Sequence, residues 1–310
     1  MSTLLKERSR TLPDAPETGA CLQAPFSGRY INLDASTQRR ARLEQQLHAL
    51  GLAHAYARFA AVDGMRMSGA PGAISRREHG CFASHARLVR EACSGSAHLH
   101  VLEDDALLSP EFLPVMRGAI DEGVLDEFDL LFTDVFVPWD PLQIASLEWA
   151  RRRHICVDPD SGRESLTGAS IFNLHGKRLA CTSSYFVARR SLDRVAGLLE
   201  SALAAGPAEP VDLTLRELVD KGTLKAACIV PFVTSVALEE ATGSTIHGEL
   251  LGPELSRLAC SVVRHAYFVR PDWGAIESVL ERYFPPQERT PRQRVVDRMM
   301  QFLIGNARPF

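Results

Sequence analysis

Short apolar runs alternate with segments of helical periodicity along most of the chain. The short runs are rich in β-branched and aromatic residues, and they predict strands, whereas apolar positions that recur every three or four residues predict helices. The predicted strands cover residues 30–33, 58–62, 98–102, 128–132, 180–188 and 225–230. The predicted helices cover residues 36–50, 77–93 and 191–203, with two more beginning near Pro110 and at Asp212, which would act as an N-cap.

This alternation indicates an α/β fold with a mainly parallel sheet flanked by helices. In such sheets, ligands bind beyond the carboxyl ends of the strands. Polar side chains occupy several of these ends, namely Asn32 and Asp34, then Glu103 to Asp105, then Asp134. We therefore expect these side chains to converge in one cleft although they lie far apart in sequence.

Three segments depart from the alternating pattern. Residues 1–28 mix charges, Pro and Gly without periodicity and are predicted to form an extended or disordered lead-in. Residues 135–177 are rich in turn formers and are predicted to form long loops around a binding face. We expect one domain over residues 29–250, followed by a helical C-terminal extension over residues 251–310.

The amino-acid composition indicates which classes of protein can be excluded. The 310 residues carry a formal net charge of −3, with 24% charged and 45% hydrophobic residues, which is typical of an ordinary globular protein. Basic residues are dispersed and not interleaved with aromatic ones, so nucleic-acid binding is not expected. The N-terminus lacks a signal-peptide pattern and the sequence lacks a long apolar run. Seven cysteines without metal-binding spacing fit a reducing compartment, and we expect a cytoplasmic protein.

The segment VLEDDAL, residues 101–107, places three consecutive carboxylates after an apolar strand. Their charges would repel one another strongly without a cation among them. In an extended segment, Glu103 and Asp105 point to one side and Asp104 to the other, so Glu103 and Asp105 could bind one hard cation such as Mn²⁺ or Mg²⁺. The alternative, equally open from the triplet alone, is that the acids cap the following helix or lie in water.

Four ordered blocks resemble a known family. They are INLDASTQRR (31–40), FAAVDG (59–64), GCFASHARL (80–88) and VLEDDALLSPEF (101–112), and they are similar in order and spacing to the lipooligosaccharide-biosynthesis glycosyltransferases of family 25, related to the collagen galactosyltransferases. Weaker similarity extends over residues 183–195 and 210–218. Ala35 and Val89 depart from the residues that the family often has there.

The resemblance implies a GT-A type fold, a UDP-hexose donor with galactose favoured, Mn²⁺ or Mg²⁺ at the acidic motif, and inversion at the anomeric carbon. By position, Glu103 and Asp105 match metal- and ribose-contacting acids and Asp104 supports them. Asn32, Arg39 and Arg40 match the block near the nucleotide. An arginine there could pair with phosphate, while one of the two is expected to be a solvated helix residue.

Each of the remaining candidate site residues also has an alternative interpretation. Ser84 and His85 match the family's Ser-His pair and are assigned to donor binding or site architecture, although His85 could be a core histidine. Asp212 and Asp134 are candidates for the base that takes the acceptor proton, with Asp212 slightly favoured. His247 could complete the metal shell, but a surface-loop histidine is the more frequent case.

The expected reaction is transfer of a hexose to a carbohydrate acceptor in lipooligosaccharide or other surface-glycan biosynthesis. A metal-dependent phosphohydrolase and a non-catalytic binding module of the same fold are the alternatives. From Pro285 onward, five arginines against two acids leave a net charge of +3 on an amphipathic segment. This tail could contact an anionic membrane surface, where a lipid-linked acceptor would lie, or pack on its own domain.

Overall fold

A computed structural model gives the structure of the chain. The described residues are 8–11, 24–67, 72–137, 141–157, 164–177, 181–237, 253–283 and Val295.

An eight-stranded mixed sheet forms the centre of the molecule, in the order β1-β9-β11-β6-β10-β4-β2-β3. All its strands except β9 and β10 run in the same direction, which confirms the largely parallel sheet. Its strands are β1 (Arg8–Thr11), β2 (Phe26–Asn32), β3 (Tyr56–Ala60), β4 (His98–Glu103), β6 (Leu130–Phe132), β9 (Gly168–Asn173), β10 (Ser184–Val187) and β11 (Ala226–Val230).

Two small antiparallel ribbons extend the sheet. The first pairs β5 (Ala106–Leu108) with β12 (Thr234–Val236), directly after the acidic segment. The second pairs β7 (Ile155–Val157) with β8 (Glu164–Leu166). The β5–β12 ribbon joins the chain after β4 to the chain after β11, so it closes the carboxyl edge of the central sheet.

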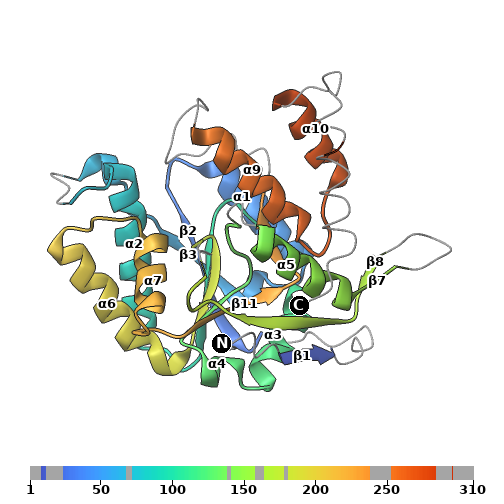
Figure 1. The fold of residues 1–310 in the computed structure, drawn as a ribbon. Helices are drawn as coiled ribbons and strands as arrows, with labels where there is room; N and C mark the ends of the chain where they lie inside the picture. Colours follow the sequence, from blue (N-terminus) through green and yellow to red (C-terminus); the bar gives the residue numbers. More distant parts are fainter. Residues whose placement is uncertain are drawn as a thin grey trace.

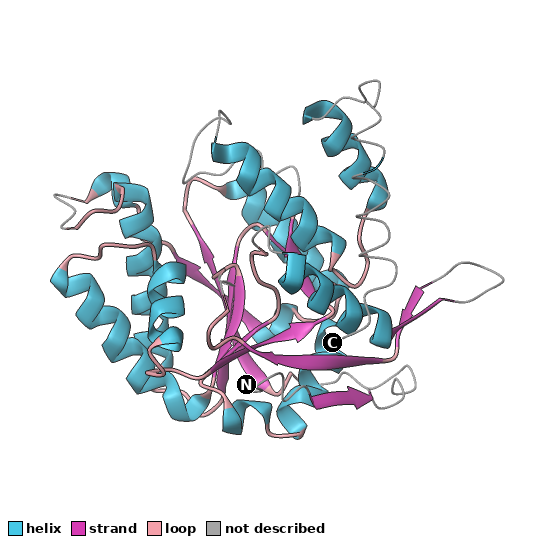
Figure 2. Cartoon of the chain, viewed as in Figure 1, coloured by secondary structure: helices cyan, strands magenta, loops and turns pink. Residues whose placement is uncertain are grey.

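Helices cover both faces of the sheet (Figures 1 and 2). Apolar side chains of α2, α5, α6 and α7 form a core on one face, and those of α1, α3 and α4 form a second core on the other. The helices are α1 (Thr37–Ala49), α2 (Arg76–Ala92), α3 (Phe112–Asp121), α4 (Val124–Glu127), α5 (Pro141–His154), α6 (Leu192–Ala205), α7 (Val211–Asp220), α9 (Pro253–Ala266) and α10 (Trp273–Tyr283), with 3₁₀ turns η1 (Ala53–Ala55), η2 (Gly64–Arg66) and η3 (Arg189–Ser191).

Helix α2 illustrates how sequence sets an element. Ser75 and Glu78 form a capping box, in which the Ser75 hydroxyl accepts from the Glu78 N–H and the Glu78 carboxylate accepts from the Ser75 N–H. Phe82 and Val89 are fully buried one above the other on its inner face. The cap and this apolar stripe fix which side chains of α2 face the sheet.

Residues 8–11 form the extended strand β1 and pair with β9, and β2 already begins at Phe26, so the described part of the lead-in belongs to the sheet. The prediction of long loops over residues 135–177 is wrong, because this segment contains α5, β7, β8 and β9. Ile144, Leu147 and Ala150 of α5 are buried against the sheet, but the three arginines that follow at 151–153 hide this stripe in the sequence.

Two element boundaries also differ from the prediction. Helix α3 begins at Phe112, beyond Pro110. Helix α7 begins at Val211 after Pro210 as its N-cap, so Asp212 lies inside the first turn and is not the N-cap. The backbone N–H groups of Leu213 and Asp212 in this first turn lower the pKa of Asp212, against the larger effect of burial, which raises it.

The described part of the C-terminal extension is helical, as predicted. Helix α9 packs beside β12 and α10 follows it; in Figure 1, α9 lies at the upper centre and α10 at the upper right. Apart from Val295, the basic tail over residues 285–310 lies outside the described residues. None of the described helices combines the length and the apolar character needed to cross a bilayer.

Candidate active site

Polar groups from neighbouring strands meet at the carboxyl edge of the sheet. Asn32 ends β2 and Glu103 ends β4, and these strands are parallel neighbours. Across this edge, the Asn32 side-chain amide donates a hydrogen bond of 2.7 Å to the Asp104 carboxylate. The predicted convergence of the β2 and β4 ends is therefore confirmed.

The acidic segment turns sharply instead of continuing the strand. Strand β4 ends at Glu103, residues 104 and 105 form a turn, and β5 begins at Ala106. Asp104 faces Asn32 and Arg39, whereas Glu103 faces the opposite partners His85 and Thr182. That Asp104 points away from Glu103 agrees with the expectation, whereas the extended backbone expected for residues 103–105 is wrong, because residues 104 and 105 form a turn.

Asp105 has the most unusual carboxylate of the three. Its Oδ1 atom is buried and has no hydrogen-bond partner among the described residues. Burial, and then the charges of Glu103 and Asp104, raise the pKa of Asp105 to about 7. A buried acceptor without a donor is costly and rare in native proteins, and such a group in an acidic cluster is suited to hold a cation.

Glu103 is held by two side chains. Thr182 donates a hydrogen bond of 2.9 Å to Glu103 Oε1, and His85 Nε2 lies 3.4 Å from the same oxygen. Burial by itself raises the pKa of Glu103, but the interactions with His85 and Thr182 outweigh it and lower the pKa overall. The Glu103 carboxylate is therefore charged, and its negative charge favours the protonated form of Asp105.

The Ser84 side chain has a structural role. Its hydroxyl accepts a 2.8 Å hydrogen bond from the Val62 N–H and donates one of 2.7 Å to the Gly80 carbonyl, one turn earlier. The Ser84 side chain is fully buried and both contacts are internal. Ser84 therefore links the segment after β3 to α2. This structural role accounts for Ser84 in the segment 80–88 without a contact to the sugar donor.

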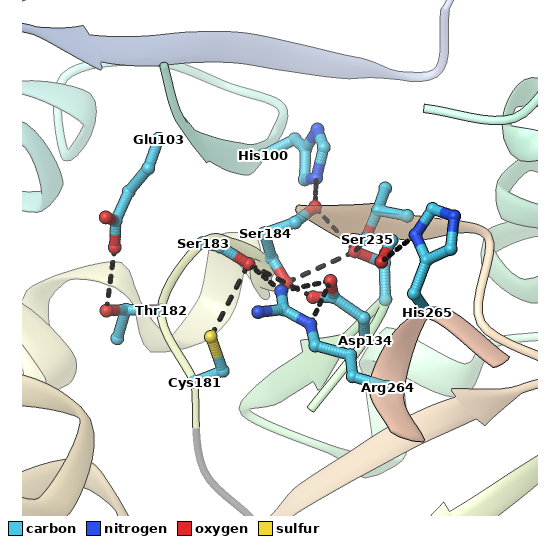
Figure 3. Close-up of polar contacts among 12 residues, drawn as sticks. His100, Glu103, Asp134, Cys181, Thr182, Ser183, Ser184, Ser235, Arg264 and His265 are labelled. Atoms are coloured by element: carbon cyan, nitrogen blue, oxygen red, sulfur yellow. Dashed lines mark hydrogen bonds and ion pairs between the residues drawn. The ribbon is translucent and has the colours of Figure 1, made fainter. Parts of the chain in front are cut away.

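Asp134 is buried in an ion pair (Figure 3). Arg264 of α9 donates two hydrogen bonds to Asp134 Oδ2, one from Nε at 2.8 Å and one from its terminal nitrogen, while Ser183 donates to Oδ1 at 3.2 Å. Both carboxylate oxygens are thus engaged. This arrangement fits an anchor for α9 better than a base that must meet an acceptor.

Asp212 lies in the first turn of α7 and is partly exposed. Its pKa is raised, first by burial, and it lies close enough to Glu103 for their charges to interact. It also lies within electrostatic range of Cys81, as Asp105 does. Of the two predicted bases, Asp212 is the partly exposed one, and its charge interacts with that of Glu103.

The remaining candidate residues lie near the end of β2, and they differ in burial and in their partners. Arg39 contacts Asp104 at 3.4 Å and is mostly buried, whereas Arg40 is exposed and pairs with Glu44 one turn later. This matches the expectation that one of the two arginines is a solvated helix residue. Asp34 is exposed and pairs with Arg58, which lowers the pKa of Asp34.

Several functional neighbours escaped the sequence analysis. Arg58 also donates to Asn32 Oδ1 at 3.0 Å, and Arg264, Cys81 and Thr182 were not singled out. Arg58 lies inside a predicted strand, where alternation toward the β2 end could have drawn attention to it. His247 lies outside the described residues.

Comparison with known proteins identifies the family. The model of a family described as "Glycosyltransferase family 25 (LPS biosynthesis protein)" matches residues 29–214, which is more than half of the chain. A search of individual curated proteins finds no match. The matched range includes the β2 end, the acidic turn and Asp212, but not Arg264 or α9. The chain belongs to glycosyltransferase family 25, and it is a glycosyltransferase of lipopolysaccharide biosynthesis.

Proposed function

We propose that the protein transfers a hexose, with galactose favoured, from a UDP-sugar to a carbohydrate acceptor with inversion, and that it needs Mn²⁺ or Mg²⁺. The observation that carries this proposal is the buried Asp105 Oδ1, which has no hydrogen-bond partner among the described residues and lies within three consecutive acids. The acceptor would be a lipooligosaccharide or another surface glycan, met in the cytoplasm at the inner membrane.

The acidic turn fits a hard divalent cation. Carboxylate oxygens are preferred ligands of Mn²⁺ and Mg²⁺, and Asp105, with Glu103 beside it, would hold the ion. A bound cation supplies charge stabilisation for the departing diphosphate. His247 remains a proposed additional ligand. Asp104 is tied to Asn32 and Arg39, so it would support the turn from the other side.

The β2 end would bind the nucleotide part of the donor. Asn32, Arg58 and Asp34 form a hydrogen-bonded group at the strand end, and Arg39 lies against Asp104 beside it. A guanidinium can pair with phosphate or stack on a base. Arg40 would contribute least, since it is exposed and paired with Glu44, and Ser84 and His85 would act through the architecture of the site.

Asp212 is the proposed base. In one displacement, the acceptor oxygen forms a bond to the anomeric carbon, the bond from that carbon to the diphosphate oxygen breaks, and the acceptor proton moves to the Asp212 carboxylate. A raised pKa brings a carboxyl group closer to the operating pH and makes it a better base. Asp134 would need to leave Arg264 and Ser183 before it could take a proton.

The test compares two variants with a matched control. Asp212→Asn should lower the transfer rate by about 10²–10⁴ while leaving Mn²⁺-dependent protection by UDP in a thermal-shift assay intact. Asp105→Asn should remove both transfer and this protection. Asp193→Asn changes a first-turn acid of α6 that is exposed, and it should leave both unchanged.

Product analysis separates transfer from hydrolysis. With UDP-galactose and acceptor glycan, a transferase forms a new glycoside, whereas a phosphohydrolase releases its products at the same rate with or without acceptor. Full transfer by Asp105→Asn would contradict the metal site, and full transfer by Asp212→Asn would contradict the base.

A further inference from the structure

Three potential metal ligands of different chemistry gather behind the acidic turn. Cys81 and His85 lie one turn apart on α2, and Glu103 reaches them from the end of β4. The Cys81 sulfur, a His85 ring nitrogen and a Glu103 carboxylate oxygen all lie within 4.8 Å of one another. This set differs from the site proposed at Asp105 in its sulfur ligand, although the two sites share Glu103.

The His85 ring is oriented toward this group. Its Nδ1 atom shares a hydrogen bond of 3.0 Å with the Tyr185 hydroxyl, while Nε2 is buried and has no hydrogen-bond partner among the described residues. Glu103 Oε1 lies 3.4 Å from Nε2. A histidine held by one nitrogen, with the other aimed at a thiol and a carboxylate, is the usual arrangement of a metal ligand.

We propose that Cys81, His85 and Glu103 form a site for a thiophilic divalent cation of the Zn²⁺ class. A sulfur and an imidazole ligand favour zinc over manganese or magnesium, which prefer oxygen. In a tetrahedral zinc site, ligand atoms are about 3.3–3.8 Å apart, so the three side chains need only a small inward movement. On binding, the Cys81 thiol gives its proton to solvent.

Glu103 belongs to both proposed sites, and this overlap has a consequence for activity. A zinc ion that engages Glu103 would draw this carboxylate away from the cation beside Asp105. Zinc would therefore inhibit transfer, and excess Mn²⁺ would oppose the inhibition. This consequence rests on the proposed function, whereas the zinc site itself does not.

Cobalt binding to the full-length, metal-free protein tests the site without an activity assay. One equivalent of Co²⁺ should produce a sulfur-to-cobalt charge-transfer band in the near ultraviolet, and Zn²⁺ should abolish it. Cys81→Ser should remove the band. Cys93→Ser, which changes the cysteine that follows the last residue of α2, should keep it, and so should Asp105→Asn.

A variant beyond the ligands makes the test sharper. Tyr185→Phe removes the hydrogen bond to His85 Nδ1 and should weaken Co²⁺ binding by about 10-fold or more while keeping the charge-transfer band. Absence of a band in the folded parent, or a band that persists in Cys81→Ser, would overturn the zinc site. Failure of UDP-sugar transfer would leave the spectrum unaffected, so the two proposals fail separately.

Discussion

Arg264 of α9 donates two hydrogen bonds to the carboxylate of Asp134, 130 residues earlier in the chain, and both side chains are buried. The pair joins a helix beyond the matched family range to the segment that follows β6. Arg264 also lies close enough to Glu103 and Asp105 to favour their charged forms. The C-terminal extension therefore takes part in the electrostatics of the site.

Removing one member of this ion pair should be costly. Arg264→Met leaves the Asp134 carboxylate buried without its cation, and we expect a loss of about 3–5 kcal/mol in the free energy of unfolding. The double variant Arg264→Met with Asp134→Leu should regain most of this loss, because neither charge remains. Urea unfolding of the parent, both single variants and the double variant gives the coupling energy.

The same double variant decides between the two candidate bases. If Asp134 only anchors α9, the double variant should fold and transfer the sugar at a rate clearly above that of Asp212→Asn. A stable double variant with a transfer rate as low as that of Asp212→Asn would contradict the assignment of Asp212.

Two glycines allow the chain after β3 to lie directly on α2. A Cβ atom at Gly80 would stand 2.6 Å from the Val62 carbonyl oxygen and the Gly64 nitrogen, and one at Gly64 would stand closer still to the Arg76 carbonyl. Gly80→Ala should therefore destabilise the protein by about 1–3 kcal/mol, as overpacking does. The free energy of unfolding measured in urea checks this value.

Gly197→Ala is the matched control for Gly80→Ala. Gly197 also lies inside a long helix, α6, but a Cβ atom there would meet nothing within 4 Å. Alanine is the better helix former by about 1 kcal/mol, so this variant should be more stable than the parent. If both alanine variants were stabilised, the close approach at Gly80 would be wrong.

Most of the candidate site within residues 29–214 could be predicted from the sequence, because its residues lie at the ends of strands. Asn32, Glu103 and Asp104 follow apolar runs, and the end of a parallel strand specifies their common edge without further information. The interior of α2 was also predictable, since Phe82 and Val89 recur at helical spacing. These features depend on short-range patterns in the sequence.

The remaining features depend on contacts that no short-range pattern contains. The chain turns at residues 104–105 and enters β5, which pairs with β12 more than 120 residues later. The partner of Asp134 comes from α9, and the ligand group behind the turn combines Cys81 with Glu103 from another element. Such pairings arise from tertiary packing, which spacing alone does not reveal.

Replacing the side-chain amide of Asn32 with a carboxylate should lower the stability of the protein. Its amide donates to Asp104 at 2.7 Å, so Asn32→Asp replaces a donor with a second carboxylate against the first. We expect a loss of about 1–3 kcal/mol in the free energy of unfolding and weaker binding of UDP by isothermal titration. The control Asn173→Asp changes an exposed strand-end residue whose side-chain oxygen accepts from the His175 N–H, and it should leave stability unchanged. Equal effects of the two changes would contradict the contact.

Asp105 should make the metal-free protein less stable at higher pH. Because its folded-state pKa is about 7, above the ordinary value of 3.8, the folded state holds the proton more tightly than the unfolded state does. The stability that Asp105 contributes is therefore present at about pH 4 and is lost as the pH rises toward 7.

Asp105→Asn, which is isosteric and uncharged, removes this dependence. In EDTA at pH 8, the variant should exceed the parent in free energy of unfolding by about 2–4 kcal/mol, and at pH 4 the two should be equal. Adding Mn²⁺ should stabilise the parent and not the variant. A variant less stable than the parent at pH 8 would mean that the Asp105 carboxylate has a protein partner, and the reason to place a cation there would be lost.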